Sequence, residues 1–272
     1  MTEKDVFVGR LREVLVVRPG EALDRLAPMQ GEPSPIVGRA IEQHHILVGT
    51  LRDCGVRVHE PELRDDTGYA SFPADCALVL EHGAILLRPH KIERRREIAA
   101  IESWLQEYGI PIAGRIDAPG LLDGGDVALA GDVAYVGVPR SGQRSNTLGR
   151  SQLSSILGIS GIRLVELALA PEIRRLTDVL TFVDEDVAIG APDFVDLAPL
   201  GTNVKVIPIP LGEQSGAGVL PLAPRRVLAN LRFRVALPTL RKAKIDVVAI
   251  DLWEFGKVGA GPSSLVLPLK RG

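Results

Sequence analysis

The chain has 272 residues, a formal net charge of −2 and 46% hydrophobic residues, so it can bury a large core and carries no overall charge that would attract nucleic acid or an anionic membrane. Its 2 cysteines and 5 histidines have neither the number nor the spacing of a disulfide framework or a zinc site. No apolar run reaches the roughly 18 residues of a membrane-spanning helix, and the N-terminal segment MTEKDVFVGR lacks the apolar core of a signal peptide. We therefore expect a soluble cytoplasmic protein without a metal ion or other cofactor.

Helices and strands are predicted to alternate along the whole chain. Helices are expected where apolar residues recur at helical spacing, at Val37–Asp53, Arg94–Tyr108, Thr147–Leu157 and Pro238–Lys244. Strands or hairpins are expected at short apolar runs bounded by turn residues, at Glu13–Pro19, Val56–His59, Ala77–Pro89, Ile110–Ala113, Leu121–Pro139, Gly161–Leu167, Val179–Ile189, Val204–Ile209, Val227–Leu237 and Ile245–Ile250. The Pro-rich residues 20–35 predict a loop.

The passage from each helix to the strand after it repeats along the chain. Four such passages align, reading LRDCGVRVHEP, LQEYGIPIAGR, LGISGIRLVEL and LRKAKIDVVAI. Their period is irregular, at roughly 50 residues, and units of this kind must close on one another to bury their faces. The repeat therefore predicts one domain over residues 1–272, an α/β propeller with a pseudo-fivefold repeat of strand-strand-helix-strand units. An open α/β sheet stays as the alternative, since the spacing does not exclude one.

In one unit, the first strand is preceded by an acidic segment that the other units lack. The segment Leu121–Pro139 reads LLDGGDVALAGDVAYVGVP and places Asp123 and Asp126 around the pair Gly124 and Gly125, before two short strands. In a propeller, the ends of the inner strands line one central cavity. A repeated scaffold in which one unit carries additional acidic residues therefore suggests an enclosed ligand site.

Several motifs together resemble a known enzyme family. They are QH at Gln43–His44, SFPAD at Ser71–Asp75, RPHKIERRRE at Arg88–Glu97, LDGGDV at Leu122–Val127, RSN at Arg144–Asn146, LTFVDED at Leu180–Asp186 and GAGPSSLVLPL at Gly259–Leu269. In this order they are similar to dimethylarginine dimethylaminohydrolase and its relatives, the arginine deiminases and amidinotransferases. The resemblance runs over nearly the whole chain and implies the pentein fold, which agrees with the fivefold repeat.

The resemblance also implies roles for individual residues. In this family a cysteine thiolate attacks a guanidinium carbon, a histidine moves protons and carboxylates hold the guanidinium. By resemblance, Asp75 and Asp123 are the substrate carboxylates, and Arg94 and Arg144 bind the α-carboxylate of the ligand. Asp126, Gly124 and Gly125 are expected to be structural. Among the histidines, His90 is the one expected near the mouth of the cavity.

The departures from the family pattern decide the expected activity. Ser264 stands at the position of the nucleophilic cysteine and Arg175 at that of the catalytic histidine, while Cys54 and Cys76 lie elsewhere. A serine hydroxyl needs an adjacent base, and arginine does not deprotonate in proteins. We therefore expect a protein that binds an arginine-like or other amino-acid ligand in the central cavity without amidine hydrolysis by the thiol mechanism.

The sequence leaves open whether the protein is catalytically active and which ligand it prefers. The alternative function is an active hydrolase of carbon–nitrogen (amidine) bonds that uses a non-standard nucleophile such as Ser264. Under this alternative, Arg175 would attract a carboxylate and shift the preferred ligand from a cationic to a zwitterionic or acidic one. The expected partner is a small amino-acid or guanidino ligand, without nucleic acid or membrane, and the resemblance is compatible with a homodimer.

Overall fold

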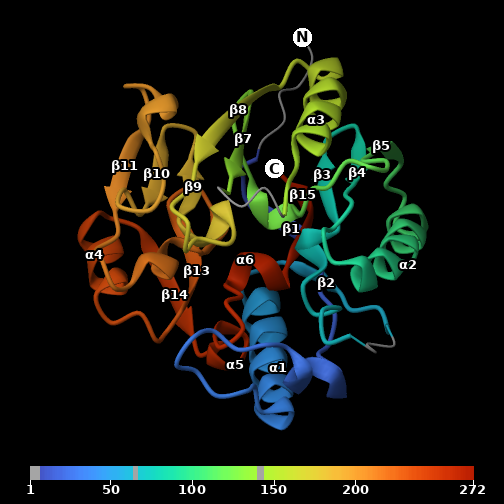
Figure 1. Cartoon of the computed structure of the whole chain (residues 1–272). Helices are drawn as coiled ribbons and strands as arrows, with labels where there is room; N and C mark the ends of the chain where they lie inside the picture. The colour runs from blue at the N-terminus through green and yellow to red at the C-terminus, as the bar shows by residue number, and fades with distance from the viewer. Residues whose placement is uncertain (1–6, 64–66, 140–143) are drawn as a thin grey trace.

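Within the residues that the structure describes, the strands form a ring of five small sheets. The computed structural model describes residues 7–63, 67–139 and 144–272, so part of the N-terminal segment considered above lies outside the described residues. Figure 1 shows the sheets arranged around a central axis, with α2, α3 and α4 at the periphery. Each sheet has three strands. Five separate sheets exclude the open α/β sheet and confirm the pentein-type α/β propeller.

Four of the sheets each come from one continuous segment. Their strands are β3 (Ala77–Leu80), β4 (Gly83–Leu86) and β5 (Ile112–Arg115); β6 (Val127–Ala130), β7 (Val133–Val138) and β8 (Arg163–Ala168); β9 (Leu180–Asp184), β10 (Val187–Gly190) and β11 (Lys205–Pro208); β12 (Leu220–Ala223), β13 (Arg226–Asn230) and β14 (Asp246–Ile250). In each, the middle strand pairs antiparallel with the first and parallel with the third. An antiparallel pair needs only a tight turn, whereas the parallel pair needs a crossover.

The fifth sheet joins the two ends of the chain. It contains β1 (Leu11–Leu15) between β2 (Arg57–His59) and β15 (Leu267–Arg271). Strand β15 runs antiparallel to β1, with Leu15 opposite Leu267. The C-terminal strand thus takes the place that the first strand of the hairpin has in the other four units. This strand was not predicted from the sequence, although it overlaps the family motif at Gly259–Leu269.

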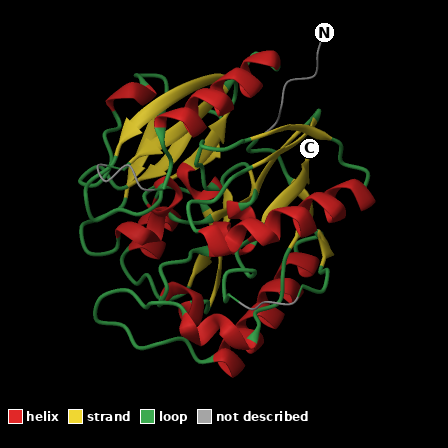
Figure 2. Cartoon of the chain, turned by 45° about the vertical axis from the view of Figure 1, so that its right-hand side comes forward, coloured by secondary structure: helices red, strands yellow, loops and turns green. Residues whose placement is uncertain are grey.

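The α-helices that connect strands within four of the sheets pack on them through one apolar face. These helices are α1 (Val37–Asp53), α2 (Arg95–Glu107), α3 (Thr147–Ile159) and α4 (Ala236–Lys242). Each buries a pair of apolar residues four positions apart, namely Leu47 and Leu51, Ile101 and Leu105, Leu153 and Leu157, and Ala236 and Leu240. Residues at this spacing share one side of a helix. Burial of each larger side chain stabilises the fold by about 1.5–3 kcal/mol. Figure 2 shows the helices in red around the yellow strands.

The prediction for the fifth unit was wrong in one respect. The segment Val227–Leu237 was expected to supply its strands, but β13 ends at Asn230, whose side chain accepts a hydrogen bond from the backbone N–H of Arg232. The partner strand β12 comes before β13, not after it. A turn at Pro224 and Arg225 joins the two, and Arg225 has a φ of 57°.

The connection between β10 and β11 is irregular, as the sequence suggested for the middle of the fourth unit. It contains the short helix η6 (Ala198–Leu200) in place of an α-helix. Within the described part of the chain, no helix is both long and apolar enough to span a membrane.

Candidate functional site

Five short helices form a ring at one end of the propeller axis. Each stands directly before an inner strand, and they are η2 (Pro73–Asp75), η4 (Gly124–Asp126), η5 (Leu176–Asp178), η7 (Gln214–Ala217) and α6 (Pro262–Leu265). Contacts join η2 to η4, η4 to η5, η5 to η7 and α6 to η2. In Figure 1, α6 lies near the middle of the view. This helix ring brings together residues that are far apart in the sequence.

Two glycines allow neighbouring helices of the ring to approach closely. A Cβ atom at Gly124 would overlap the carbonyl oxygen of Ala74, and one at Gly125 would lie 2.7 Å from Cδ of Arg175. The backbone N–H of Gly125 donates to Oδ1 of Asp75 at 3.0 Å, and the hydroxyl of Thr177 donates to the carbonyl oxygen of Gly125 at 3.0 Å. The glycine pair therefore connects η2, η4 and η5.

Arg94 and Asp75 form a buried ion pair beside the helix ring. Nη1 of Arg94 lies 2.6 Å from Oδ2 of Asp75, and Nη2 lies 2.9 Å from Oε2 of Glu97. Nη2 also donates to the carbonyl oxygen of Phe72 at 2.9 Å. Burial alone would raise the pKa of Asp75, but the charges of Arg94, Arg144 and Arg175 outweigh it and lower that pKa to about 2. Asp75 is therefore ionised and already paired with a protein cation.

A second cluster surrounds Asp123. Nδ1 of His90 lies 2.8 Å from Oδ2 of Asp123, and the backbone N–H of His90 donates to the same oxygen at 3.3 Å. Nε of Arg144 donates to Oδ1 of Asp126 at 3.3 Å, whereas Nη2 of Arg144 stays 3.7 Å from Oδ1 of Asp123, beyond a good hydrogen bond. Burial, aided by the charges of Asp123 and Asp75, raises the pKa of Asp126 to about 7 despite the opposing charge of Arg144.

This cluster leaves three buried polar atoms without a hydrogen-bond partner among the described residues. They are Oδ1 of Asp123, Oδ2 of Asp126 and Nη2 of Arg144. Buried polar groups are normally satisfied by protein, water or a bound ligand, because a lost hydrogen bond costs free energy. Two acceptors and one donor are therefore available to a polar molecule at this place.

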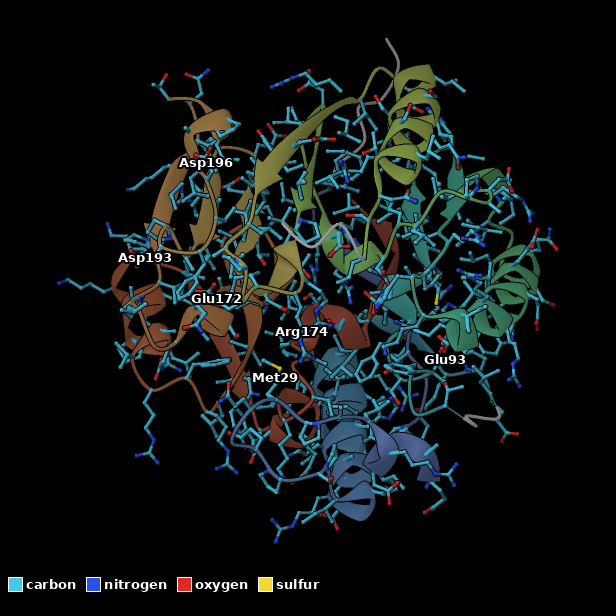
Figure 3. The ribbon with its side chains drawn as sticks, viewed as in Figure 1. Met29, Glu93, Glu172, Arg174, Asp193 and Asp196 are labelled. Carbon is cyan, nitrogen blue, oxygen red and sulfur yellow. The ribbon has the colours of Figure 1, made fainter. Side chains whose placement is uncertain are left out.

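Arg175 and Ser264 meet in the helix ring. Nη1 of Arg175 donates to Oγ of Ser264 at 2.9 Å, and both residues are buried, with 8% and 3% of their surface exposed. Nη2 of Arg175 lies 2.9 Å from Oδ1 of Asp178. Burial raises the pKa of Asp178, although the charge of Arg175 opposes the shift. The neighbouring Arg174 is exposed, and Figure 3 labels it near the middle of the view.

Neither cysteine is placed as a nucleophile of the ring. Cys76 is fully buried and its Sγ lies 3.5 Å from Oε2 of Glu97. Burial is the main reason that the pKa of this thiol is raised well above its ordinary value, so it stays protonated. Cys54 follows the last residue of α1, where its Sγ lies 3.9 Å from Nη2 of Arg226.

The structure brings most of the expected site residues together, but they pair with one another. Asp75, Asp123, Asp126, Arg94, Arg144, Arg175 and Ser264 all lie in or beside the helix ring. Of these, Asp75 and Ser264 line a cavity of about 760 Å³, together with Gly124 and Gly125.

Sequence reasoning missed two acids of the site, Glu97 and Asp178. Asp178 stands two residues before its inner strand, as Asp75 does. Alignment of the segments that enter the hairpins, FPADCALVL and RLTDVLTFV, would have found it.

Comparison with known proteins agrees with this architecture. No protein-family model matches the chain. The chain is 30% identical over 221 residues to N(G),N(G)-dimethylarginine dimethylaminohydrolase of Streptomyces coelicolor, covering 81% of this chain and 82% of that protein. It is 26% identical over 236 residues to the protein of the same name from Pseudomonas aeruginosa, covering 86% of this chain and 89% of that protein.

A solved structure shows the same fold. It is a dimethylarginine dimethylaminohydrolase variant in an adduct with S-methyl-L-thiocitrulline, and it superimposes with a TM-score of 0.86. The match covers 94% of this chain and 99% of that one, at 24% sequence identity. With the fold, the five-unit repeat and the similarity over most of its length in agreement, the chain belongs to the dimethylarginine dimethylaminohydrolase family of the pentein superfamily.

Proposed function

We propose that this protein binds an arginine-like or other amino-acid ligand at the helix ring and does not hydrolyse amidines by the thiol mechanism of its family. The contact between Arg175 and Ser264 carries this proposal. It joins the two residues that the resemblance places at the positions of the catalytic histidine and cysteine. A guanidinium donates hydrogen bonds and cannot accept a proton, so the hydroxyl of Ser264 has no base in Arg175.

The unpartnered atoms of the Asp123 cluster support an amino-acid ligand. A zwitterion carries an ammonium group, which the free oxygens of Asp123 and Asp126 would accept, and a carboxylate, which Nη2 of Arg144 would bind. The ligand in the solved relative, S-methyl-L-thiocitrulline, is also an amino acid. By contrast, Asp75 is already neutralised by Arg94, so it is a weaker receptor for a further guanidinium.

Turnover of dimethylarginine tests the catalytic half of the proposal. Citrulline release is measured with purified protein, and we expect none above the uncatalysed rate. Citrulline release by the wild-type protein that Ser264→Ala abolishes would contradict the proposal. Such a result would favour the alternative, a hydrolase of amidine bonds with Ser264 as nucleophile.

Calorimetric titration with L-arginine, L-citrulline and L-glutamate tests the binding half. We expect at least one of these amino acids to bind, and Arg144→Gln to weaken that binding tenfold or more. Arg163→Gln is the matched control, because Arg163 is exposed on β8, away from the ring. If none of the three amino acids binds, or if both variants bind as the wild type does, the ligand proposal is wrong.

A double substitution asks whether the rest of the site is intact. Ser264→Cys with Arg175→His restores the residue types that the family resemblance implies at these positions. Recovery of citrulline release would support the assignment of Asp75, Asp123 and Arg144 to ligand binding. The cytoplasmic location and the homodimer remain predictions, which cell fractionation and sedimentation velocity would test.

A further inference from the structure

The cavity continues from the helix ring along the axis of the propeller. It has a volume of about 760 Å³, within the range of about 300–1,000 Å³ that is common for small-molecule sites. Asp75 and Ser264 stand at its ring end, and residues of all five inner strands, β3, β6, β9, β12 and β15, form its wall. We call this cavity the axial channel. Most of its lining side chains are apolar, among them Leu80, Leu129 and Phe182.

Arg271, in the wall of the channel, differs from the arginines of the helix ring in the groups that hold its guanidinium. Nη1 of Arg271, near the end of β15, donates to the carbonyl oxygens of Gly9 and Pro221, each at 3.0 Å. These carbonyl groups fix the guanidinium without neutralising it. Among the described residues, no carboxylate forms an ion pair with Arg271. Burial alone, without an opposing anion, lowers the pKa of Arg271 to about 10.

The surroundings of Arg271 favour an anion. Lys270 also lines the channel. The acidic side chains of the wall are Glu81, at the turn between β3 and β4, and Asp75, which Arg94 neutralises. A partly desolvated cation beside an apolar wall is unfavourable alone and becomes favourable once an anion pairs with it.

We propose that the axial channel binds an apolar monocarboxylate, with its carboxylate on Arg271 and its hydrocarbon or aromatic body between the inner strands. A guanidinium held in place by two carbonyl groups presents its remaining N–H donors in the fixed geometry that carboxylates match. The apolar wall would bury the hydrocarbon or aromatic body of the molecule. This site is separate from the Asp123 cluster and does not depend on the proposed function.

Three probes with the same body and different head groups test this proposal. Sodium octanoate, octanol and octylamine are titrated into the full-length protein by calorimetry. We expect octanoate to bind with one site per chain, and octanol and octylamine to bind at least tenfold more weakly. Absence of octanoate binding at millimolar concentration, or equal binding of octylamine, would overturn the proposal.

Variants of Arg271 then test where the carboxylate of octanoate binds. We expect Arg271→Gln to weaken octanoate binding at least tenfold and Arg271→Lys, which keeps the charge, to weaken it less. Arg57→Gln is the control, because Arg57 is an exposed arginine of the same sheet that does not line the channel. Arg144→Gln is expected to leave octanoate binding unchanged, which separates this site from the amino-acid site.

A purely structural role for Arg271 predicts a different pattern. Arg271→Gln would then lower the melting temperature, because Gly9 and Pro221 lose a donor, while octanoate affinity stays that of the wild type. That outcome refutes the proposal. If Arg271→Gln does not fold, Arg271→Lys and the three head groups still decide the matter, since a site that ignores charge would bind octanol and octanoate equally.

Discussion

The ion pair between Arg94 and Asp75 gives the sharpest test of what holds the helix ring together. Arg94→Met keeps most of the apolar volume of the side chain and removes its charge. Asp75 and Glu97, which are 4% and 7% exposed, would then lose the buried guanidinium of Arg94. Breaking a buried ion pair from one side costs about 3–5 kcal/mol, out of the about 5–15 kcal/mol that stabilises a typical domain. The carbonyl oxygen of Phe72 would also lose a donor now 2.9 Å away.

An exposed pair of nearly the same length is the control. Nη2 of Arg115 lies 2.7 Å from Oε1 of Glu102, but their side chains are 50% and 26% exposed. Water screens such a pair, so Arg115→Met should cost no more than about 1 kcal/mol. Both variants would be measured by urea denaturation followed by circular dichroism. A cost for Arg94→Met that does not exceed the cost for Arg115→Met would refute the reasoning.

The pH dependence separates the lost charge from lost packing. In the wild-type protein the pKa of Asp75 is lowered from 3.8 to about 2, so this carboxylate adds stability that is present above 3.8 and is lost as the pH falls towards 2. Without Arg94, burial is the largest influence and should raise this pKa above 3.8. The variant would then lose stability as the pH rises through that raised pKa. We expect the gap between wild type and Arg94→Met to be smaller at pH 5 than at pH 8.

Three further predictions follow from the ring and the core. Because the pKa of Asp126 is raised from 3.8 to about 7, the folded state binds its proton more tightly, and stability should fall as the pH rises from 3.8 to 7; Asp126→Asn should remove this part of the pH dependence in urea denaturation. Gly124→Ala should destabilise the protein strongly through overlap with Ala74, whereas Gly158→Ala in α3, where a Cβ meets nothing within 4 Å, should be neutral or stabilise it by up to about 1 kcal/mol in thermal unfolding. Leu105→Ala should cost about 2–5 kcal/mol in the same assay, because Leu105 is fully buried.

Local patterns in the sequence predicted most of the fold. Apolar spacing placed α1 at its observed bounds, Val37–Asp53, and the helix-to-strand passages revealed the repeat. Strand β15 was missed because its partner β1 lies at the other end of the chain, and a pairing of that kind leaves no local signal. The hairpin of the fifth unit was misplaced because the apolar residues of β13 run on through Leu231 and Phe233 towards α4.

The residues of the candidate site were predicted from the sequence, but the contacts between their side chains were not. Sequence motifs selected Asp75, Arg94 and Arg175, yet each side chain could equally face a ligand or another side chain. The structure shows Arg94 on Asp75 and Arg175 on Asp178. Such choices depend on distances between η2, η5 and the start of α2, which are set by packing around the ring. They become visible only when the whole propeller is closed.

Closure of the ring by β15 also bears on how the chain folds during synthesis. Arg12 and Gly272, which meet at this closure, are 260 residues apart, so β1 lacks its antiparallel partner until β15 has been synthesised. Closing so long a loop is slow compared with forming a hairpin. Until it happens, β1 presents an unpaired edge, and β3 lacks the contacts that it makes with β15 in the closed ring. The nascent chain therefore exposes this edge until β15 pairs with β1.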